Sequence, residues 1–301
     1  MFVALYAFDG TWNRDKPGSD ADTNVLKFAQ AYRPQSAVLY QAGVGTRLGL
    51  AGRIAGGITG AGARTRVKEA LAAARKNFRD GDTAIDIIGF SRGAAIAIEF
   101  AYRVFRDGIS GVPAPPIRFL GLLDCVPSFG IPGNEWDLGW HLTNLTDNVA
   151  KCYHAISLDE RRGSFPLNRL SARVGHADQE GRLFELWFRG VHSDVGGGNK
   201  NAGLSDIALY WMFRSAMRSG LVFDQAAVDD ARQNEKPDTP ISVHDVDPVP
   251  NPFRVIRWND CVHTSVADRV DKRPRFHNNP PSGLTVVDDD GVIQTKRYGE
   301  G

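Results

Sequence analysis

Short apolar runs alternate with amphipathic stretches along the first 220 residues of the chain. The apolar runs predict buried strands at Phe2 to Phe8, Ala37 to Gln41, Thr83 to Ile88, Ile117 to Leu123 and Leu183 to Phe188. Apolar residues at helical spacing predict helices at 24–32, Thr65 to Phe78, Gly93 to Arg106 and Ser205 to Arg218. Strands that alternate with helices are typical of an α/β fold, with a mostly parallel sheet covered by helices on both faces.

The same pattern suggests how the chain is divided. Residues 1–225 hold all the strongly patterned elements and predict an α/β core. Within it, 127–182 is irregular and polar in parts, which indicates an insertion or cap with a helix near 143–153. Residues 226–301 are proline-rich and polar, with one strand-like piece at Phe253 to Trp258. We expect this part to form a C-terminal extension that packs on the core. A chain of this size needs no disulfide or metal to stabilise its core.

Composition narrows the choice of partners. The formal net charge of +1 gives no reason to expect nucleic acid. Cys125, Cys152 and Cys261 have no CxxC spacing, so no metal site is predicted. The glycine-rich stretch 43–66 lacks the spacing of a nucleotide-binding loop, and we expect no cofactor.

The N-terminus and the lack of long apolar stretches bear on localisation. The start, MFVALYAFDGTWN, is typical of a strand and not of a Sec signal. No run approaches the roughly 18 apolar residues of a membrane span. We therefore expect a soluble protein that is cytoplasmic in the producing cell, which leaves export by a non-Sec route into a target cell open.

Residues that can carry chemistry gather at predicted strand ends. Asp9, Ser91, Asp124, His192 and Asp194 each follow an apolar strand directly or within a short turn. In open parallel sheets, ligands bind beyond the carboxyl ends of the strands. We therefore expect the functional site at this edge.

Residues 89–93 (GFSRG) match the G-x-S-x-G nucleophile elbow, between a predicted strand and an alanine-rich helix. The glycines permit a strained turn that lifts the Ser91 hydroxyl above the sheet. The helix start, including the Arg92 N–H, would face a developing oxyanion. The structural alternative is an ordinary glycine-rich turn with a capping serine. The context favours Ser91 as a nucleophile.

A serine nucleophile needs a base and an orienting carboxylate. His192 is the favoured base because it follows a strand and precedes a glycine-rich turn. His263 is the rival, with Asp194 as its partner. For the acid we favour Asp124, and in that version Asp194 would hold the loop by bonding its own backbone. Both alternatives stay open from the residues alone.

The first strand end can complete such a site. The N–H groups of Gly10 and Thr11 would supply the second half of an oxyanion hole, together with that of Arg92. Asp9 would then give structural support at the same strand end.

Seven ordered motifs carry a resemblance to a known family. They are residues 8–13 (FDGTWN), 23–24 (TN), 43–46 (GVGT), 89–94 (GFSRGA), 121–124 (GLLD), 157–162 (SLDERR) and 190–198 (GVHSDVGGG). The chain resembles, over roughly residues 2–222, an α/β-hydrolase family of uncharacterised bacterial proteins. That family includes the catalytic domain of type VI secretion phospholipase effectors. One departure is Cys125, where the family commonly has threonine.

The resemblance implies an α/β-hydrolase fold and a triad of Ser91, Asp124 and His192. It also implies phospholipase activity on bacterial membrane lipids, and as partners a lipid or ester substrate, peripheral membrane contact, a secretion spike and an immunity protein. We therefore expect a serine esterase or phospholipase that works through an acyl-enzyme. The alternatives are a cytoplasmic small-molecule esterase and a non-catalytic module that retains the fold.

Overall fold

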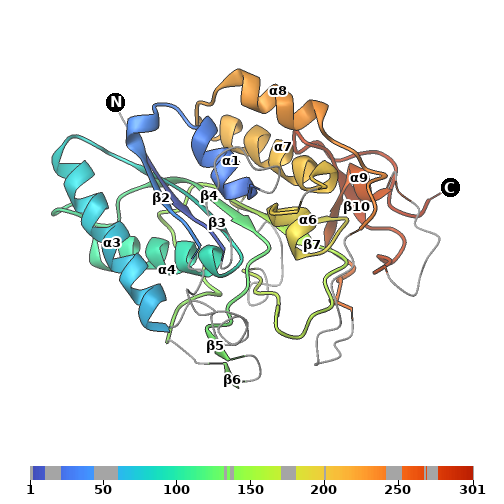
Figure 1. The fold of residues 1–301 in the computed structure, drawn as a ribbon, viewed down its shortest axis with the longest axis horizontal. Coiled ribbons are helices and arrows are strands. Elements are labelled where there is room, and N and C mark those ends of the chain that lie inside the picture. Colours follow the sequence, from blue (N-terminus) through green and yellow to red (C-terminus); the bar gives the residue numbers. More distant parts are fainter. Residues whose placement is uncertain are drawn as a thin grey trace.

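The computed structural model has one large sheet at its centre (Figure 1). It describes residues 3–10, 22–43, 60–131, 134–135, 139–170, 181–199, 201–241, 253–267, 269 and 277–300. The strands of the sheet are β1 (Ala4–Phe8), β2 (Val38–Gln41), β3 (Ile85–Phe90), β4 (Ile117–Leu123), β7 (Cys152–Ser157), β8 (Leu183–Phe188), β9 (Cys261–His263) and β10 (Thr285–Val287). Their spatial order is β10-β9-β8-β7-β4-β3-β1-β2, and neighbouring strands run parallel. Strands β5 (Gly130–Ile131) and β6 (Asn134–Glu135) form a separate antiparallel pair. The predicted α/β class with a mostly parallel sheet is confirmed.

Helices cover both faces of this sheet. In chain order they are α1 (Asn24–Ala31), the 3₁₀ helix η1 (Gln35–Ala37), α3 (Gly60–Arg79), α4 (Arg92–Asp107), α6 (His192–Gly196), α7 (Gly203–Arg218), α8 (Gln225–Gln233) and α9 (Thr264–Ala267). Helices α1, α7 and α8 share an apolar core with Leu5 and Ala7 of β1. Helices α3 and α4 share another core with Tyr6 and Phe8. Figure 1 shows the two groups on opposite sides of the strands. Because side chains alternate along a strand, β1 contributes to both cores.

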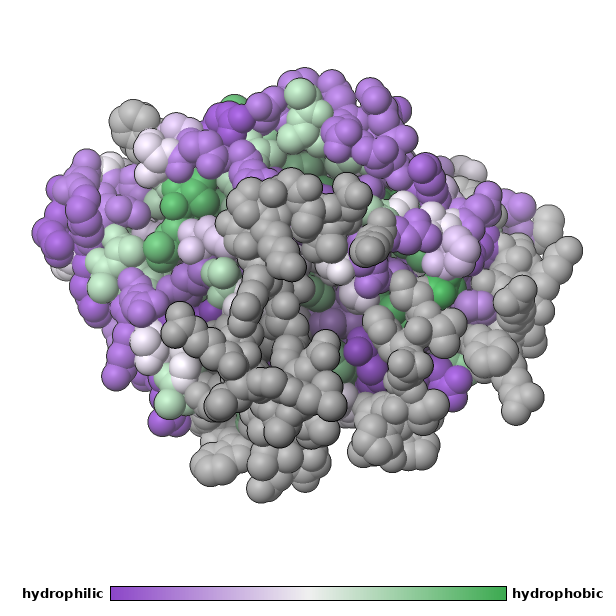
Figure 2. All heavy atoms as spheres, viewed as in Figure 1, coloured by the Kyte–Doolittle hydropathy of each residue, from purple (hydrophilic) through white to green (hydrophobic). Residues whose placement is uncertain are grey.

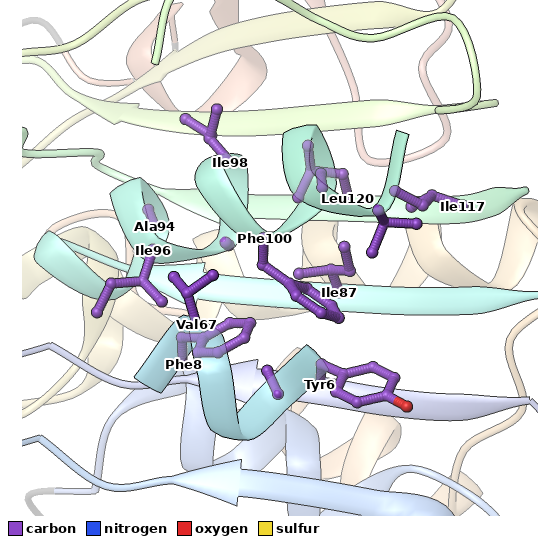
Figure 3. Close-up of a cluster of buried hydrophobic side chains, with 14 of the residues drawn as sticks. Tyr6, Phe8, Val67, Ile87, Ala94, Ile96, Ile98, Phe100, Ile117 and Leu120 are labelled. Carbon is purple, nitrogen blue, oxygen red and sulfur yellow. The ribbon is translucent and has the colours of Figure 1, made fainter. Parts of the chain in front are cut away.

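Helix α4 follows the predicted nucleophile turn and packs closely on the sheet. Its small buried residues include Ala94, Ala95, Ala97 and Ala101. They let the helix approach β1 and β3, while Phe100 fills the remaining space. The Phe100 ring lies 5.0 Å from that of Tyr6 and 5.7 Å from that of Phe8. Figure 3 shows it pointing from α4 toward Ile87. The helix ends at Asp107 and is capped by Gly108, which has a φ of 66°.

The outer surface of the molecule is mostly polar where helices face solvent. Helix α8 buries Val228 and Ala231, and the surface over it is mainly hydrophilic (Figure 2). Within the described ranges, none of the helices combines the length and the apolar character required to cross a bilayer.

The order of strands places a switch point between β1 and β3. From β1 the chain moves outward to β2, then returns to β3 on the other side of β1 and adds β4, β7, β8, β9 and β10 in turn. Ligands bind at such a point, beyond the carboxyl ends of the strands. The residues that follow these two strand ends are Asp9 and Ser91. The topology therefore brings the two strand-end motifs together.

The predicted helix near 143–153 is wrong. Residues 143–151 form turns and irregular backbone, and Cys152–Ser157 is strand β7, between β4 and β8. His154 interrupts the apolar pattern of this strand. It is tolerated in the interior because its Nδ1 lies 3.1 Å from Glu185 Oε1. A strand of the central sheet therefore arises from within 127–182.

The strand-like piece Phe253 to Trp258 is also not a strand. Arg254 and Ile256 of this segment turn inward, Arg254 to the Asp124 carboxylate and Ile256 to a small apolar core that includes Trp187. These side-chain contacts hold the segment in place, and its backbone does not pair with a strand of the sheet. Strands β9 and β10, which the sequence did not predict, continue the sheet from within 226–301. The division into a core and an extension stays a prediction.

Candidate active site

Ser91 occupies a strained turn between β3 and α4. Its backbone has a φ of 58° and a ψ of −127°, a conformation that L residues rarely adopt. The turn is fixed on both sides: the Ser91 N–H donates to Leu123 O at 3.0 Å, and Ser91 O accepts from the Val126 N–H at 3.2 Å. The residue is 2% exposed, so its hydroxyl lies below the molecular surface. Strain of this kind is held where the surrounding structure over-determines it, which is common at functional sites.

The glycines that flank the serine are required by close backbone contacts. A Cβ on Gly93 would lie 2.1 Å from Phe8 O, and one on Gly89 would lie 2.6 Å from Gly93 O. Neither position has room for a side chain. The close packing of α4 on β1 and β3 therefore depends on both glycines.

Asp124 and His192 form a short hydrogen bond next to this turn. The His192 Nδ1 lies 2.6 Å from Asp124 Oδ2, and both side chains are buried. Asp124 follows β4 in the left-handed region, with a φ of 43°. His192 begins α6, after β8. The structure thus brings together the favoured acid and the favoured base.

Three further groups hold the Asp124 carboxylate. The Ser157 N–H donates to Oδ1 at 2.9 Å, and the Ser157 hydroxyl donates to Oδ2 at 3.0 Å. The Arg254 guanidinium donates to both oxygens, at 2.5 Å and 3.1 Å. Each carboxylate oxygen therefore has at least two donors, and the carboxylate has little rotational freedom.

The His192 imidazole lies between two aromatic rings. Its centroid is 4.6 Å from that of Phe90 and 4.8 Å from that of Phe165. The His192 backbone N–H donates to Glu160 Oε2 at 3.1 Å. Glu160 in turn accepts from the Arg162 guanidinium at 2.8 Å. Both the ring and the backbone of His192 are therefore fixed.

Burial and charge set the protonation of these groups. Burial lowers the pKa of His192 below its usual value, although the Asp124 carboxylate acts in the opposite direction. Burial alone would raise the pKa of Asp124, but the charge of Arg254 and the hydrogen bond from His192 hold it well below its usual range. Burial also opposes ionisation of Glu160, yet its bonds from Arg162 lower the pKa to about 2. Near neutral pH this combination favours a neutral imidazole beside an ionised carboxylate.

The rival pair Asp194 and His263 is engaged elsewhere. Asp194 Oδ2 accepts from the Val191 N–H at 3.1 Å, within its own loop. The two ring nitrogens of His263 lie 2.9 Å from Ser265 Oγ and 3.1 Å from Asp289 Oδ1. The geometry therefore favours Asp124 over Asp194 and His192 over His263.

The predicted oxyanion donors differ in availability. Arg92 is the first residue of α4, so its N–H has no acceptor within the helix. The Gly10 N–H donates to Asp9 Oδ1 at 2.6 Å and is already engaged. Asp9 also accepts from the hydroxyls of Thr23 and Tyr40, which fixes the end of β1. Thr11 lies outside the described residues.

A cavity of about 380 Å³ is lined by residues that contact the Asp124–His192 pair, although Ser91, Asp124 and His192 are not among its lining residues. Its walls include Phe165, which contacts the His192 ring, and Arg254, which contacts Asp124. Phe253 and Leu167 add apolar surface. The volume lies within the usual range of ligand sites. The remaining walls are largely charged, because Glu160, Arg162, Arg169 and Arg257 also line the cavity. In the part of the chain that can be described, no cluster of three or more His, Cys, Asp or Glu side chains is placed to hold a metal ion.

Several residues of this site were not predicted as site residues. Ser157 and Glu160 lie in the motif at 157–162, which marked the region without giving either a role. Phe165 and Arg254 had no signal in the sequence. Arg254 follows Asp124 by 130 residues, and only the fold brings the two together.

The fold and the geometry of this site define an α/β-hydrolase-like protein. The model of the family described as "T6SS, Phospholipase effector Tle1-like, catalytic domain" matches residues 4–110 and 101–215, more than half of the chain. The chain belongs to this family. No protein with a curated description matches it.

Two solved structures are similar in fold. One is an uncharacterized protein from Pseudomonas aeruginosa, with a TM-score of 0.54 and 22% identity; the match covers 74% of this chain and 47% of that one. The other is the Tle1 effector bound to the VgrG spike of the type 6 secretion system, with a TM-score of 0.52 and 18% identity. That match covers 75% of this chain and 76% of the effector. The chain thus spans about half the length of the first structure and three quarters of the second.

Proposed function

We propose that this chain is a serine hydrolase that cleaves the carboxylic esters of phospholipids through an acyl-enzyme. Ser91 is the nucleophile, His192 the base and Asp124 the orienting acid. The observation that carries the proposal is the 2.6 Å contact between His192 Nδ1 and Asp124 Oδ2, beside the strained Ser91 turn. Membership of a family of phospholipase catalytic domains supports the choice of substrate.

The reaction follows from the protonation of the pair. With Nδ1–H donated to Asp124, the lone pair of His192 is on Nε2, which accepts the Ser91 hydroxyl proton. Ser91 Oγ attacks the acyl carbonyl carbon, and the imidazolium gives its proton to the departing alcohol. Water, deprotonated by the same imidazole, then releases the fatty acid and restores Ser91. The Arg92 N–H, at the positive end of α4, stabilises the oxyanion.

The test is the Ser91→Ala variant on a short-chain p-nitrophenyl ester. We expect kcat to fall by about three powers of ten or more, with Ser219→Ala, at the end of α7, as a matched control near the wild-type rate. A fluorophosphonate probe should label the wild type and not Ser91→Ala. A wild-type rate in Ser91→Ala would overturn the nucleophile. Folded wild-type protein that neither turns over ester nor takes the probe would indicate a non-catalytic module.

The base is tested by a pair of variants. His192→Ala should lose nearly all activity, because His192 is the imidazole that the Asp124 carboxylate orients. His263→Ala should keep most of it, since the ring bonds Ser265 and Asp289. The reverse result would transfer the base to His263 and the acid to Asp194.

We propose that the lipid approaches through the segment 253–258. Val255 is 79% exposed and Trp258 is 85% exposed, whereas Phe253 of the same segment lines the cavity together with Phe165, which contacts His192. Arg257 is also exposed and lines this cavity. Exposed tryptophan and aliphatic side chains beside a cationic one suit the surface of an anionic bilayer. Peripheral membrane contact would then place the ester bond near the cavity.

Vesicles distinguish a lipase from an esterase of small molecules. A phospholipase should bind vesicles that contain phosphatidylglycerol and release fatty acid from them. Turnover of the soluble ester, with no vesicle binding and no release of fatty acid, would favour the small-molecule esterase.

A delivery partner is proposed by analogy alone. The structurally similar Tle1 effector is bound to a VgrG spike. We propose that this chain is delivered into a target cell by a related spike, and that an immunity protein protects the producing cell. Co-purification of the chain with a spike protein tests the first part. Loss of toxicity in target cells when a neighbouring gene product is co-expressed tests the second.

A further inference from the structure

Arg254 is a buried arginine with no role in the reaction described above. Its side chain is 8% exposed and is surrounded by acceptors. The two N–H groups of Nη1 are shared among Asp124 Oδ1, Ser157 O and Ser157 Oγ, and Nη2 donates to Asp124 Oδ2 and to Phe165 O. The guanidinium therefore joins the proposed catalytic acid to the two residues that pack around the acid and the base.

The backbone around Arg254 is fastened to the core. Arg254 O accepts from Asn278 Nδ2 at 2.9 Å, and the Asn278 N–H donates to the buried Asp159 at the same distance. Asp159 is bonded in turn by the Arg189 guanidinium. Two residues further on, Ile256 packs into the apolar core beneath β8 and β9. The position of Arg254 is thus determined by the fold and not by its bond to Asp124 alone.

We propose that Arg254 is a positioning residue that holds the Asp124 carboxylate in the orientation His192 requires and balances its charge. This rests on the proposed function, since it assigns a role through the Asp124–His192 pair. The planar guanidinium meets both carboxylate oxygens at once, which a lysine cannot do.

Charge balance gives the proposal a measurable consequence. Two acidic residues, Asp124 and Glu160, bond to His192 directly, and each is paired with a basic residue: Glu160 with Arg162 and Asp124 with Arg254. With Arg254 present, the two carboxylates are balanced by two guanidinium groups. Without it the surroundings of the imidazole become net negative, which stabilises the imidazolium and raises the pKa of His192. The base would then be protonated at a pH where the wild type is active.

The experiment compares the pH dependence of kcat/KM for a soluble ester in three variants. In Arg254→Gln we expect a loss of about tenfold to a hundredfold near neutral pH, with the acidic limb moved up by about one pH unit. Arg254→Lys keeps the charge without the planar fork, so its limb should stay near that of the wild type while kcat falls. Arg118→Gln is the matched control, because Arg118 makes a bidentate bond to the buried Asp86 at the other end of the strands. That control should keep the wild-type limb.

Outcomes that overturn the proposal are distinct from those that overturn the function. An acidic limb in Arg254→Gln that superimposes on those of the wild type and Arg118→Gln would reject the role of Arg254. A fully active Ser91→Ala would reject the proposed function itself. If Arg254→Gln fails to fold, the pH profile of Arg254→Lys still tests the proposal. Lysine keeps the positive charge, so an acidic limb that moves to higher pH in this variant would contradict the role of that charge. Labelling rates with a fluorophosphonate, followed against pH, report the same limb for the active fraction only.

Discussion

Two parts of the molecule hold the Asp124 carboxylate, and they do so by different means. From within the sheet, the ends of β4 and β7 fix it through the backbone: Asp124 has a φ of 43°, and the Ser157 N–H donates to it at 2.9 Å. From outside the sheet, the segment 253–258 reaches it with a single long side chain, that of Arg254. The strand ends therefore hold the carboxylate through the backbone, and the segment adds a guanidinium that meets both of its oxygens and compensates its charge.

The largest effect should come from changing the carboxylate that both parts hold. In Asp124→Asn we expect kcat to fall by about three to four powers of ten, because the amide favours the wrong tautomer of His192. The same change also leaves Arg254 buried without its counter-charge, so stability should fall as well. Turnover of a p-nitrophenyl ester and urea unfolding measure the two effects.

The control for that prediction is Asp194→Asn, at the next strand end. Asp194 bonds the Val191 N–H and Asn199, so we expect its loss of activity to stay within about tenfold. If Asp194→Asn were the more damaging change, the acid would be Asp194. The strand ends and Arg254 would then hold a carboxylate that is not the catalytic acid.

A substitution at Gly93 tests the close backbone contact between the end of β1 and the start of α4. An added Cβ would lie 2.1 Å from Phe8 O, so β1 and α4 would have to separate. In Gly93→Ala we expect a loss of about 3 kcal/mol or more in the free energy of unfolding. Gly111→Ala is the control, with a φ of 85° and no atom within 4 Å of the new Cβ, and should cost about 1–2 kcal/mol. Equal losses in urea unfolding would show that the close contact is unimportant.

The two parts also differ in how far the sequence predicts them. The nucleophile turn was predictable because apolar runs, glycines and an alanine-rich helix agree with one another over a short range. Asp124 and His192 could be proposed because each follows a strand. Strand β7 was missed because the buried His154 interrupts its pattern, and its acceptance depends on Glu185 of the neighbouring strand. Arg254 could not be found, because a lone arginine in a polar tail has no local pattern and its partner is 130 residues away.

The opposing effects of burial and of the Asp124 charge on the pKa of His192 should be visible in the pH profile of the wild type. Because burial lowers the pKa of His192, the imidazole gains its proton only at a pH below its usual value of about 6.5. We expect the acidic limb of kcat/KM for a soluble ester to have its midpoint below that value. The unfolded chain takes up this proton at about pH 6.5, so the contribution of His192 to stability is lost as the pH falls further. A limb centred well above pH 6.5 would indicate that the charge of Asp124 outweighs burial and Arg254.

The smallest effect concerns the outward side of the same segment. Trp258 and Val255 are exposed and take no part in holding Asp124. If they contact lipid, Trp258→Ala should weaken binding to phosphatidylglycerol vesicles by about threefold to tenfold, because less apolar surface enters the bilayer. Val255→Ala should act in the same direction, and Val222→Ala, an exposed valine after α7, is its matched control. Flotation measures binding, and turnover of a soluble ester is the reference. If Val222→Ala weakened binding as much as Val255→Ala, the segment would have no special part in membrane contact, and its role would be confined to the inward Arg254.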